Sequence, residues 1–173
     1  MAVKTIYPSV DTYINYYAAD TNYDGATTLL MYSSWAAFPF MKFTGIPNGK
    51  IISAYLKAYY NDGAGTGQDV VDIKVITSSW VSTTMTWNTG VPTIGASYGS
   101  ITCGSVTGAK TSTDLKTLIE YWQTNPIYGI KLIGDGGVDC TGTFDSLEGT
   151  NKPYLEITYI PPSGFSGGQP MIF

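Results

Sequence analysis

Apolar and polar residues alternate along much of the chain, and this pattern predicts a protein built mainly from β-strands. In residues 70–76, Val71, Ile73 and Val75 alternate with less apolar neighbours, which is the period of a strand with one buried face. Gly-containing turn sequences such as Asn48-Gly49 separate the alternating segments. The predicted strands are 5–7, 12–16, 28–32, 38–43, 52–60, 70–76, 99–103, 129–133, 143–146 and 154–160.

Many short strands joined by tight turns are typical of a β-sandwich. In the last predicted strand, Leu155, Ile157 and Tyr159 lie on one side and more polar residues on the other, so the sheet has one face in water. We therefore expect an all-β, jelly-roll-type antiparallel β-sandwich formed by residues 1–160.

One short amphipathic helix interrupts the strand pattern. Its apolar residues recur at helical spacing, a plausible start lies at Thr113-Asp114, and Asn125-Pro126 sets its end. We expect it to cover an open end or flank of the sandwich, with a role in the core. The apolar positions are Leu115, Leu118, Ile119 and Trp122.

The segment after the strand at 70–76 is rich in Ser and Thr, yet it carries Trp80 and Trp87. Bulky side chains in such a loop cover either the sandwich core or a ligand, and strand-end tryptophans more commonly pack. With Thr86, Asn88 and Pro92, the segment resembles the DNRLRE domain family. It departs from the family's pattern just after the first tryptophan, where the usual acidic residue is missing.

The order of several other segments agrees with this resemblance, which covers roughly residues 5–160. The family is a β-sandwich family that includes a group described as carbohydrate-binding modules, so the resemblance implies the same fold and a capacity to bind carbohydrate. The segments are 9–14, 20–32, 38–60, 125–134 and 143–159.

Composition excludes several classes of chemistry. The chain has no histidine, which argues against Ser-His-Asp and Cys-His catalysis and against most zinc sites. All nine basic residues are lysines and the net charge is −4, which argues against nucleic acid and anionic lipid as partners. No apolar run has the length of a membrane span. The acids form no convincing catalytic pair, so we expect no enzyme activity.

Cys103 and Cys140 are the two cysteines, and their spacing fits no metal motif. They form either one disulfide between two late segments of the sandwich or two buried thiols.

The strongest metal candidate is the run from Asp20 to Gly25. Asp20, Asn22 and Asp24 occupy positions 1, 3 and 5 of a calcium loop, with glycine at position 6. The acid at position 12 is missing, so Asp11 and Asp145 would have to supply further ligands. An ordinary Asx-rich turn explains the same residues. We expect no other cofactor.

Exposed aromatic residues are the main candidates for a contact surface. Tyr55 and Tyr59 share one face of the strand at 52–60, opposite small and apolar residues, and Trp35 lies at a predicted turn. Such rings either stack on sugars or protein partners, or stabilise an exposed sheet as cross-strand pairs.

The last residues, 161–173, change character: prolines and a Gly/Ser spacer lead to Met171, Ile172 and Phe173. This tail is either a docking segment for a neighbouring subunit or a frayed end. The first residues lack the apolar stretch of a secretory signal. We expect either that a leader was removed or that the protein reaches its site by another route, such as virion assembly.

The leading hypothesis from sequence is a non-catalytic structural protein on the surface of an assembly, most simply a virion decoration or fibre component docked through its tail. The alternative is a carbohydrate-binding module of an extracellular polysaccharide-acting system. A third option is a structural domain of a microbial cell surface.

Overall fold

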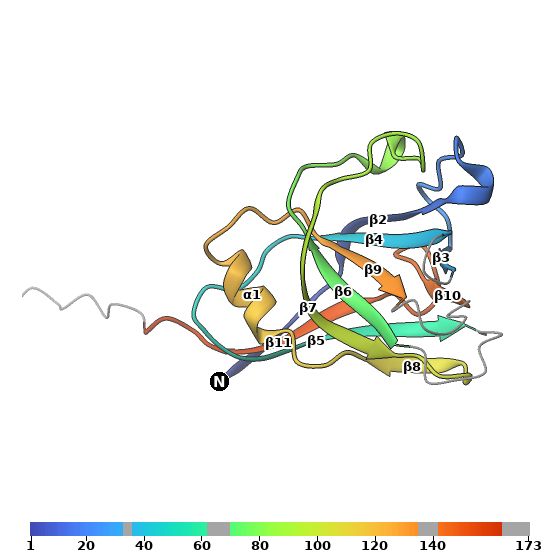
Figure 1. The fold of residues 1–173 in the computed structure, drawn as a ribbon. Coiled ribbons are helices and arrows are strands. Elements are labelled where there is room, and N and C mark those ends of the chain that lie inside the picture. Colours follow the sequence, from blue (N-terminus) through green and yellow to red (C-terminus); the bar gives the residue numbers. More distant parts are fainter. Residues whose placement is uncertain (33–35, 62–69, 135–141, 164–173) are drawn as a thin grey trace, which may run out of the picture.

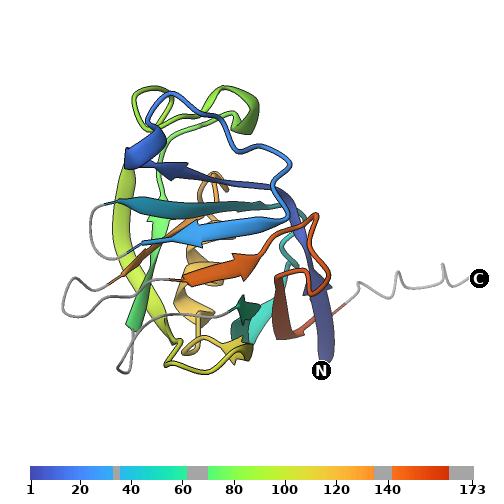
Figure 2. The same ribbon diagram turned by 90° about the vertical axis from the view of Figure 1, so that its right-hand side faces the viewer.

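The computed structural model of the protein describes residues 1–32, 36–61, 70–134 and 142–163, and these form a sandwich of two antiparallel sheets (Figures 1 and 2). In the first sheet the strand order is β1-β11-β5-β10-β3, with β8 on the other side of β5. In the second sheet the order is β2-β4-β9-β6-β7. The elements are β1 (Ala2–Ile6), β2 (Pro8–Asn15), η1 (Tyr16–Ala18), β3 (Thr28–Met31), β4 (Ala37–Phe43), β5 (Lys50–Asn61), β6 (Val70–Ile76), η2 (Ser82–Thr84), β7 (Ile94–Thr102), β8 (Gly108–Thr111), α1 (Lys116–Trp122), β9 (Ile130–Gly134), β10 (Gly142–Asp145) and β11 (Tyr154–Ile160).

The predicted all-β antiparallel sandwich with one short helix is confirmed. Apart from shifts of one or two residues at strand ends, four strands differ from the expectation. β1 begins at Ala2 rather than Thr5, and β2 begins at Pro8 rather than Thr12. β7 begins at Ile94 rather than Gly99, and β8 was not predicted because its sequence, GAKT, has no apolar alternation. β8 forms instead through its main-chain pairing with Lys57–Tyr60 of β5. Pairing with a neighbour, rather than local sequence, thus determines this strand.

The main core lies between the two sheets. Alternate residues of β5 and β11 face inward, so that Ala54, Leu56, Leu155 and Ile157 are buried. The predicted helix residues also belong to this core, and the Trp122 ring lies 6.2 Å from that of Phe43. The expected core role of α1 is therefore confirmed.

The segment just before α1 packs so closely on β7 that a side chain at one strand position would displace its neighbours. A Cβ atom at Gly99 would lie 2.6 Å from both the Leu115 side chain and the Thr113 hydroxyl. The turn before the helix is held further by Asp114, whose Oδ1 accepts hydrogen bonds from the N–H groups of Lys116 and Ala54, each at 2.9 Å. These contacts fix the connection from β8 to α1 against β5.

A second apolar cluster covers the outer face of the β2-β4-β9-β6-β7 sheet. β4 is buried on both faces: Met41 belongs to the main core, while Phe38 and Phe40 belong to the second cluster. The segment 77–93, which includes η2, supplies the cover (Figure 1, green). Its Trp80 donates a hydrogen bond from Nε1 to the carbonyl of Tyr128 at 2.7 Å.

Trp87 completes this cover by stacking on Phe38, with the ring planes at 17° and the centroids 5.8 Å apart. The prediction that Trp80 and Trp87 are packing residues is thus confirmed, but they cover a sheet face rather than the end of the core. None of the helices in the described part of the chain is long and apolar enough to cross a membrane.

Candidate functional site

A surface cavity of about 540 Å³ opens on the outer face of the β1-β11-β5 sheet, beside β8. Strand residues form its floor and one side, and the loop between β10 and β11 forms another side. The lining residues are Tyr7, Lys57, Ala58, Tyr59, Ala109, Lys110, Thr111, Thr150, Asn151, Lys152 and Tyr154.

Strand register explains why these residues meet. Lys57 of β5 pairs with Tyr154 of β11 on one side and with Thr111 of β8 on the other, so the three side chains form a row across the sheet. Two residues along β5, Tyr59 repeats the arrangement opposite Ala109. Because side chains alternate along a strand, all of these point away from the core.

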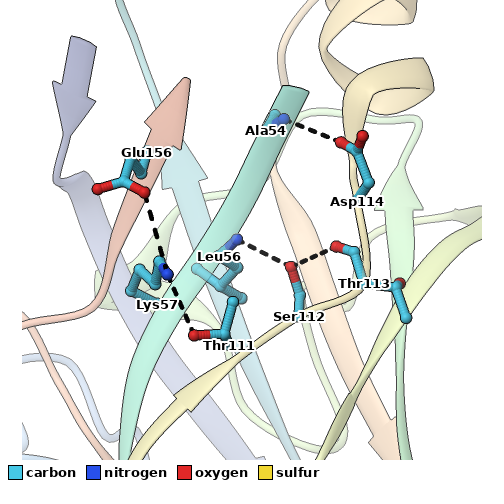
Figure 3. A network of polar contacts seen from close by, with 8 residues as sticks. All are labelled: Ala54, Leu56, Lys57, Thr111, Ser112, Thr113, Asp114 and Glu156. Carbon is cyan, nitrogen blue, oxygen red and sulfur yellow. Dashed lines mark hydrogen bonds and ion pairs between the residues drawn. The ribbon is translucent and has the colours of Figure 1, made fainter. Parts of the chain in front are cut away.

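Lys57 lines the cavity and contacts several neighbours, two of which are drawn in Figure 3. Its Nζ donates a hydrogen bond to Thr111 Oγ1 at 3.2 Å, and Glu156 Oε1 is 3.9 Å away. The Tyr55 ring lies below it, with the centroid 5.6 Å from Nζ. These partners orient the ammonium group while the side chain remains partly exposed to water.

Beyond Thr111 the main chain still bonds to β5, since the Ser112 N–H donates to the Leu56 carbonyl at 3.0 Å, and side chains add to the pairing (Figure 3). Ser112 Oγ accepts a hydrogen bond from the Leu56 N–H at 2.9 Å and donates one to the carbonyl of Thr113 at 2.7 Å. A buried main-chain N–H without a partner is costly, so this hydroxyl stabilises the edge on which the cavity depends.

The loop between β10 and β11 is fixed by a buried carboxylate. Asp145 Oδ2 accepts hydrogen bonds from the main-chain N–H and the side-chain amide of Asn151, at 2.8 and 3.0 Å, and Oδ1 accepts one from Asn61 Nδ2. Burial alone would raise the pKa of Asp145, but the hydrogen bonds from Asn61 and Asn151 outweigh it and lower the pKa. Asn151 is thereby held at the cavity wall.

A second buried carboxyl supports the same loop from below. Asp11 of β2 accepts a hydrogen bond from the Leu147 N–H at 2.7 Å. Burial raises its pKa to about 7; the Leu147 N–H opposes this rise, and the neighbouring acids Glu148 and Asp24 add to it. Asp11 is therefore largely protonated in slightly acidic solution.

The lining residues combine aromatic, cationic and neutral polar groups. Tyr7 and Tyr154 form a tilted pair with centroids 5.8 Å apart, and Tyr59 adds a third ring. Lys57 and Lys152 supply positive charge, and Glu156, 3.9 Å from Lys57 Nζ, offsets part of it. Lys110 pairs with inward-facing Ala58 and its Nζ lies 5.8 Å from the buried Tyr60 ring, so its side chain lies on the other face of the sheet. The cavity thus combines aromatic rings with two ammonium groups in a chain of net charge −4.

The structure brings only part of the predicted contact surface together. Tyr59 lines the cavity, whereas Tyr55 is not among the lining residues and contacts Lys57 through its ring. Trp35 and the tail residues Met171, Ile172 and Phe173 lie outside the described residues, so both hypotheses remain predictions, as does the division into 1–160 and 161–173.

Sequence reasoning missed the lysines and the loop residues of the cavity. Lys57 could have been found from its position between Tyr55 and Tyr59 on the same strand face. Lys110 and Lys152 give no such signal, because β8 has no strand pattern and the 150–152 loop is placed by tertiary contacts.

The proposed calcium residues form an Asx turn linked to the covering segment. Asn22 Oδ1 accepts a hydrogen bond from the Asp24 N–H at 3.1 Å, and its amide donates to the carbonyls of Ser82 and Met85. Asp20 Oδ1 accepts from Asn88 Nδ2 at 2.8 Å. Within the described ranges no three His, Cys, Asp or Glu side chains gather as a metal-binding group. Calcium binding at Asp20, Asn22 and Asp24 remains a prediction.

Cys103 is buried in the main core. Its possible partner Cys140 lies outside the described residues, so the Cys103–Cys140 disulfide also remains a prediction.

Comparison with known proteins adds two findings. A family model described as carbohydrate-binding module family 96 matches residues 2–159, which is nearly the whole sandwich. The chain is also 27% identical over 161 residues to the tRNA nuclease WapA of Bacillus subtilis strain 168 and to the tRNA(Glu)-specific nuclease WapA of B. subtilis subsp. natto strain BEST195. Each match covers 89% of this chain but only 6% of the relative.

Proposed function

We propose that this chain, which belongs to carbohydrate-binding module family 96, binds an acidic polysaccharide in the cavity around Lys57. The observation that carries the proposal is the lining itself, where three tyrosines meet Lys57 and Lys152, with Glu156 as the neighbouring acid that orients Lys57. Family membership supports a carbohydrate ligand, and the charge of the cavity favours a uronate-containing or sulfated one.

The tyrosines and two of the lysines in the cavity have defined tasks in this proposal. The rings of Tyr7, Tyr59 and Tyr154 pack against the apolar faces of the sugar rings, and their hydroxyls contact sugar hydroxyls. Lys57 and Lys152 pair with carboxylate or sulfate groups along the polymer. A lysine is a point charge without the fixed geometry of arginine, so this contact selects charge more than orientation.

The proposed role is binding without catalysis, at an extracellular surface. The family match supports the carbohydrate-binding alternative from the sequence rather than the virion decoration, for which neither the cavity nor the comparisons offer support. The nuclease activity in the names of the two WapA relatives is not transferred, because this chain spans only 6% of their length.

Affinity electrophoresis tests the proposal. Native gels containing polygalacturonate or carrageenan should retard the protein, and the retardation should weaken as salt is added, because exposed charges are screened. The Lys152→Met variant should lose most of the retardation that the acidic polymer causes in the wild-type protein. Lys116→Met is the matched control, because Lys116 lies on α1 and outside the cavity lining. No retardation by either polymer, or equal loss in both variants, would contradict the proposal.

A further inference from the structure

A second group of aromatic side chains lies exposed at η1, away from the cavity. Tyr16, Tyr17 and Tyr32 are 58%, 75% and 39% exposed. The Tyr16 and Tyr17 centroids are 5.6 Å apart, and those of Tyr17 and Tyr32 are 6.1 Å apart. We call these three residues the tyrosine step.

The step is held firmly by its surroundings. The Tyr16 N–H donates to the carbonyl of Ala36 at 2.7 Å, and Asn15 Oδ1 accepts from the Tyr17 N–H at 3.0 Å. The Tyr16 ring also contacts Trp87 edge to face at 5.5 Å, and Trp87 stacks in turn on buried Phe38. Because these contacts fix the main chain of η1 and the Tyr16 ring before a ligand arrives, binding at Tyr16 costs less side-chain entropy.

A further pair of contacts ties the η1 loop to the covering segment. The Asn88 N–H donates to the carbonyl of Ala19 at 3.2 Å, and the Asn88 side-chain amide donates to Asp20 Oδ1. Figures 1 and 2 both place these two segments together at the top of the molecule, on the side opposite β8, whose residues line the cavity. The tyrosine step and the cavity are therefore separate surfaces.

The geometry of the step favours a single sugar ring or a twisted soluble chain over a flat crystalline surface. The ring plane of Tyr17 is at 73° to that of Tyr16 and at 76° to that of Tyr32, so the three rings do not form one flat surface. Each ring offers an apolar face and a hydroxyl group, which match the apolar face and hydroxyls of a pyranose.

The tyrosine step and the cavity also differ in charge. Among the described residues that form and hold the step, the charged side chain is that of Asp20, which is acidic. An acidic polysaccharide would be repelled here, whereas an uncharged one would not.

The exposed area also selects among possible occupants. Three partly exposed tyrosine rings offer at most about 400 Å² of surface, since a whole aromatic side chain buries up to roughly 250 Å². A stable protein complex needs roughly 800 Å² from each partner. The step is thus large enough for a few sugar residues and small for a protein.

From these observations we infer that the tyrosine step is a second carbohydrate-binding site, which takes an uncharged soluble polysaccharide by aromatic stacking. The inference rests on the carbohydrate chemistry of the proposed function, but it does not require the cavity to bind anything. A chain with both sites would hold acidic and neutral polymers at once.

Native gels containing hydroxyethyl cellulose, xyloglucan or galactomannan test this inference. At least one polymer should retard the wild-type protein, and Tyr17→Ala should weaken its affinity roughly tenfold, as expected for loss of an aromatic anchor. Lys152→Met in the cavity should leave this binding unchanged. Because Tyr17 is highly exposed, the variant should keep the melting temperature of the wild type.

Three outcomes would overturn the inference: no retardation by any of the uncharged polymers, equal retardation of Tyr17→Ala and wild type, or loss of binding in Lys152→Met instead. A fourth is a dimer in sedimentation velocity that Tyr17→Ala converts to a monomer, which would make the step a protein interface. Tyr17→Ala should still bind the acidic polymer, so failure here is distinguishable from failure of the cavity.

Discussion

Asp145 binds Asn151 twice, through the main-chain N–H at 2.8 Å and the side-chain amide at 3.0 Å. The carboxylate is buried, whereas Asn151 and its neighbours line the cavity. A residue hidden from the ligand therefore determines where one wall of the cavity stands.

Replacing this carboxylate should damage both stability and binding. Asp145→Ala leaves the Asn151 donors and the Asn61 amide without their acceptor, which should lower the free energy of unfolding by about 1–3 kcal/mol. Urea denaturation at pH 7 measures this loss. The affinity for the acidic polymer that retards the wild-type protein should fall as well, because Asn151 loses its hydrogen-bond acceptor. A variant with wild-type stability would show that the carboxylate contributes little.

Asp145 should also give the protein a characteristic response to acid. Its pKa is lower in the folded than in the unfolded protein, so its contribution to stability is present above pH 3.8 and is lost as the pH falls further. The melting temperature should drop below pH 3.8 in the wild type and less steeply in Asp145→Ala. Parallel curves for the two proteins would contradict the assignment.

Asp11 should change the stability with pH in the opposite direction and over a different pH range. Its pKa is raised from 3.8 to about 7 in the folded protein, so its contribution is complete below pH 3.8 and is lost as the pH rises through 7. The stability change from this group is on the order of 2–4 kcal/mol. Asp11→Asn, which cannot ionise, should be more stable than the wild type at pH 8. A wild-type stability that is flat between pH 4 and 7, with no gain in the variant, would contradict this account.

The lowered pKa of Lys131 gives a third test of how burial of a charged group affects stability. It lies on β9 with Nζ 3.6 Å from the Phe38 ring centroid, and burial lowers its pKa to about 8, with the charge of Lys74 as a smaller cause. The charged form is therefore disfavoured in the fold below pH 8, and stability should rise between pH 8 and 10.5.

Lys131→Met should remove this rise and increase stability at pH 7 by about 1–2 kcal/mol, because the loss of the cation–π contact offsets part of the gain. Lys74→Met is the companion variant: it should move the rise to higher pH without abolishing it. Denaturation curves at pH 7, 9 and 10.5 measure both. A destabilised Lys131→Met at pH 7 would mean that the cation–π contact outweighs the cost of burial.

The covering segment can be tested through its single indole hydrogen bond. Trp80→Phe keeps an aromatic ring next to Phe40 but removes the donor to the Tyr128 carbonyl, and the smaller ring packs less fully. We expect a loss of about 1–3 kcal/mol in the free energy of unfolding. Guanidinium denaturation checks this, and an unchanged midpoint would contradict the packing role of the segment.

The sequence predicts the elements whose pattern is local. The alternation around Ile73 and the helical spacing of Leu118 and Trp122 both identify their elements, because each buries one face against the main core. β8 escapes prediction because its four residues gain a strand conformation only from pairing with β5.

The candidate site is less predictable for the same reason. Lys57, Thr111 and Tyr154 come from strands far apart in the chain, and only their register places them in one row. Buried Asp11 likewise finds its hydrogen-bond donor, the Leu147 N–H, 136 positions away in sequence. No local pattern indicates either arrangement.

Amide chemical-shift mapping by NMR tests the central claim most directly. A short acidic oligosaccharide, prepared from the polymer that retards the protein, is titrated into the ¹⁵N-labelled chain. We predict that the largest shifts fall on the residues of the cavity, in β5 around Lys57, in β8 around Thr111 and in the loop around Asn151. Shifts concentrated at η1, or none at saturating oligosaccharide, would contradict the claim that the cavity binds an acidic polysaccharide.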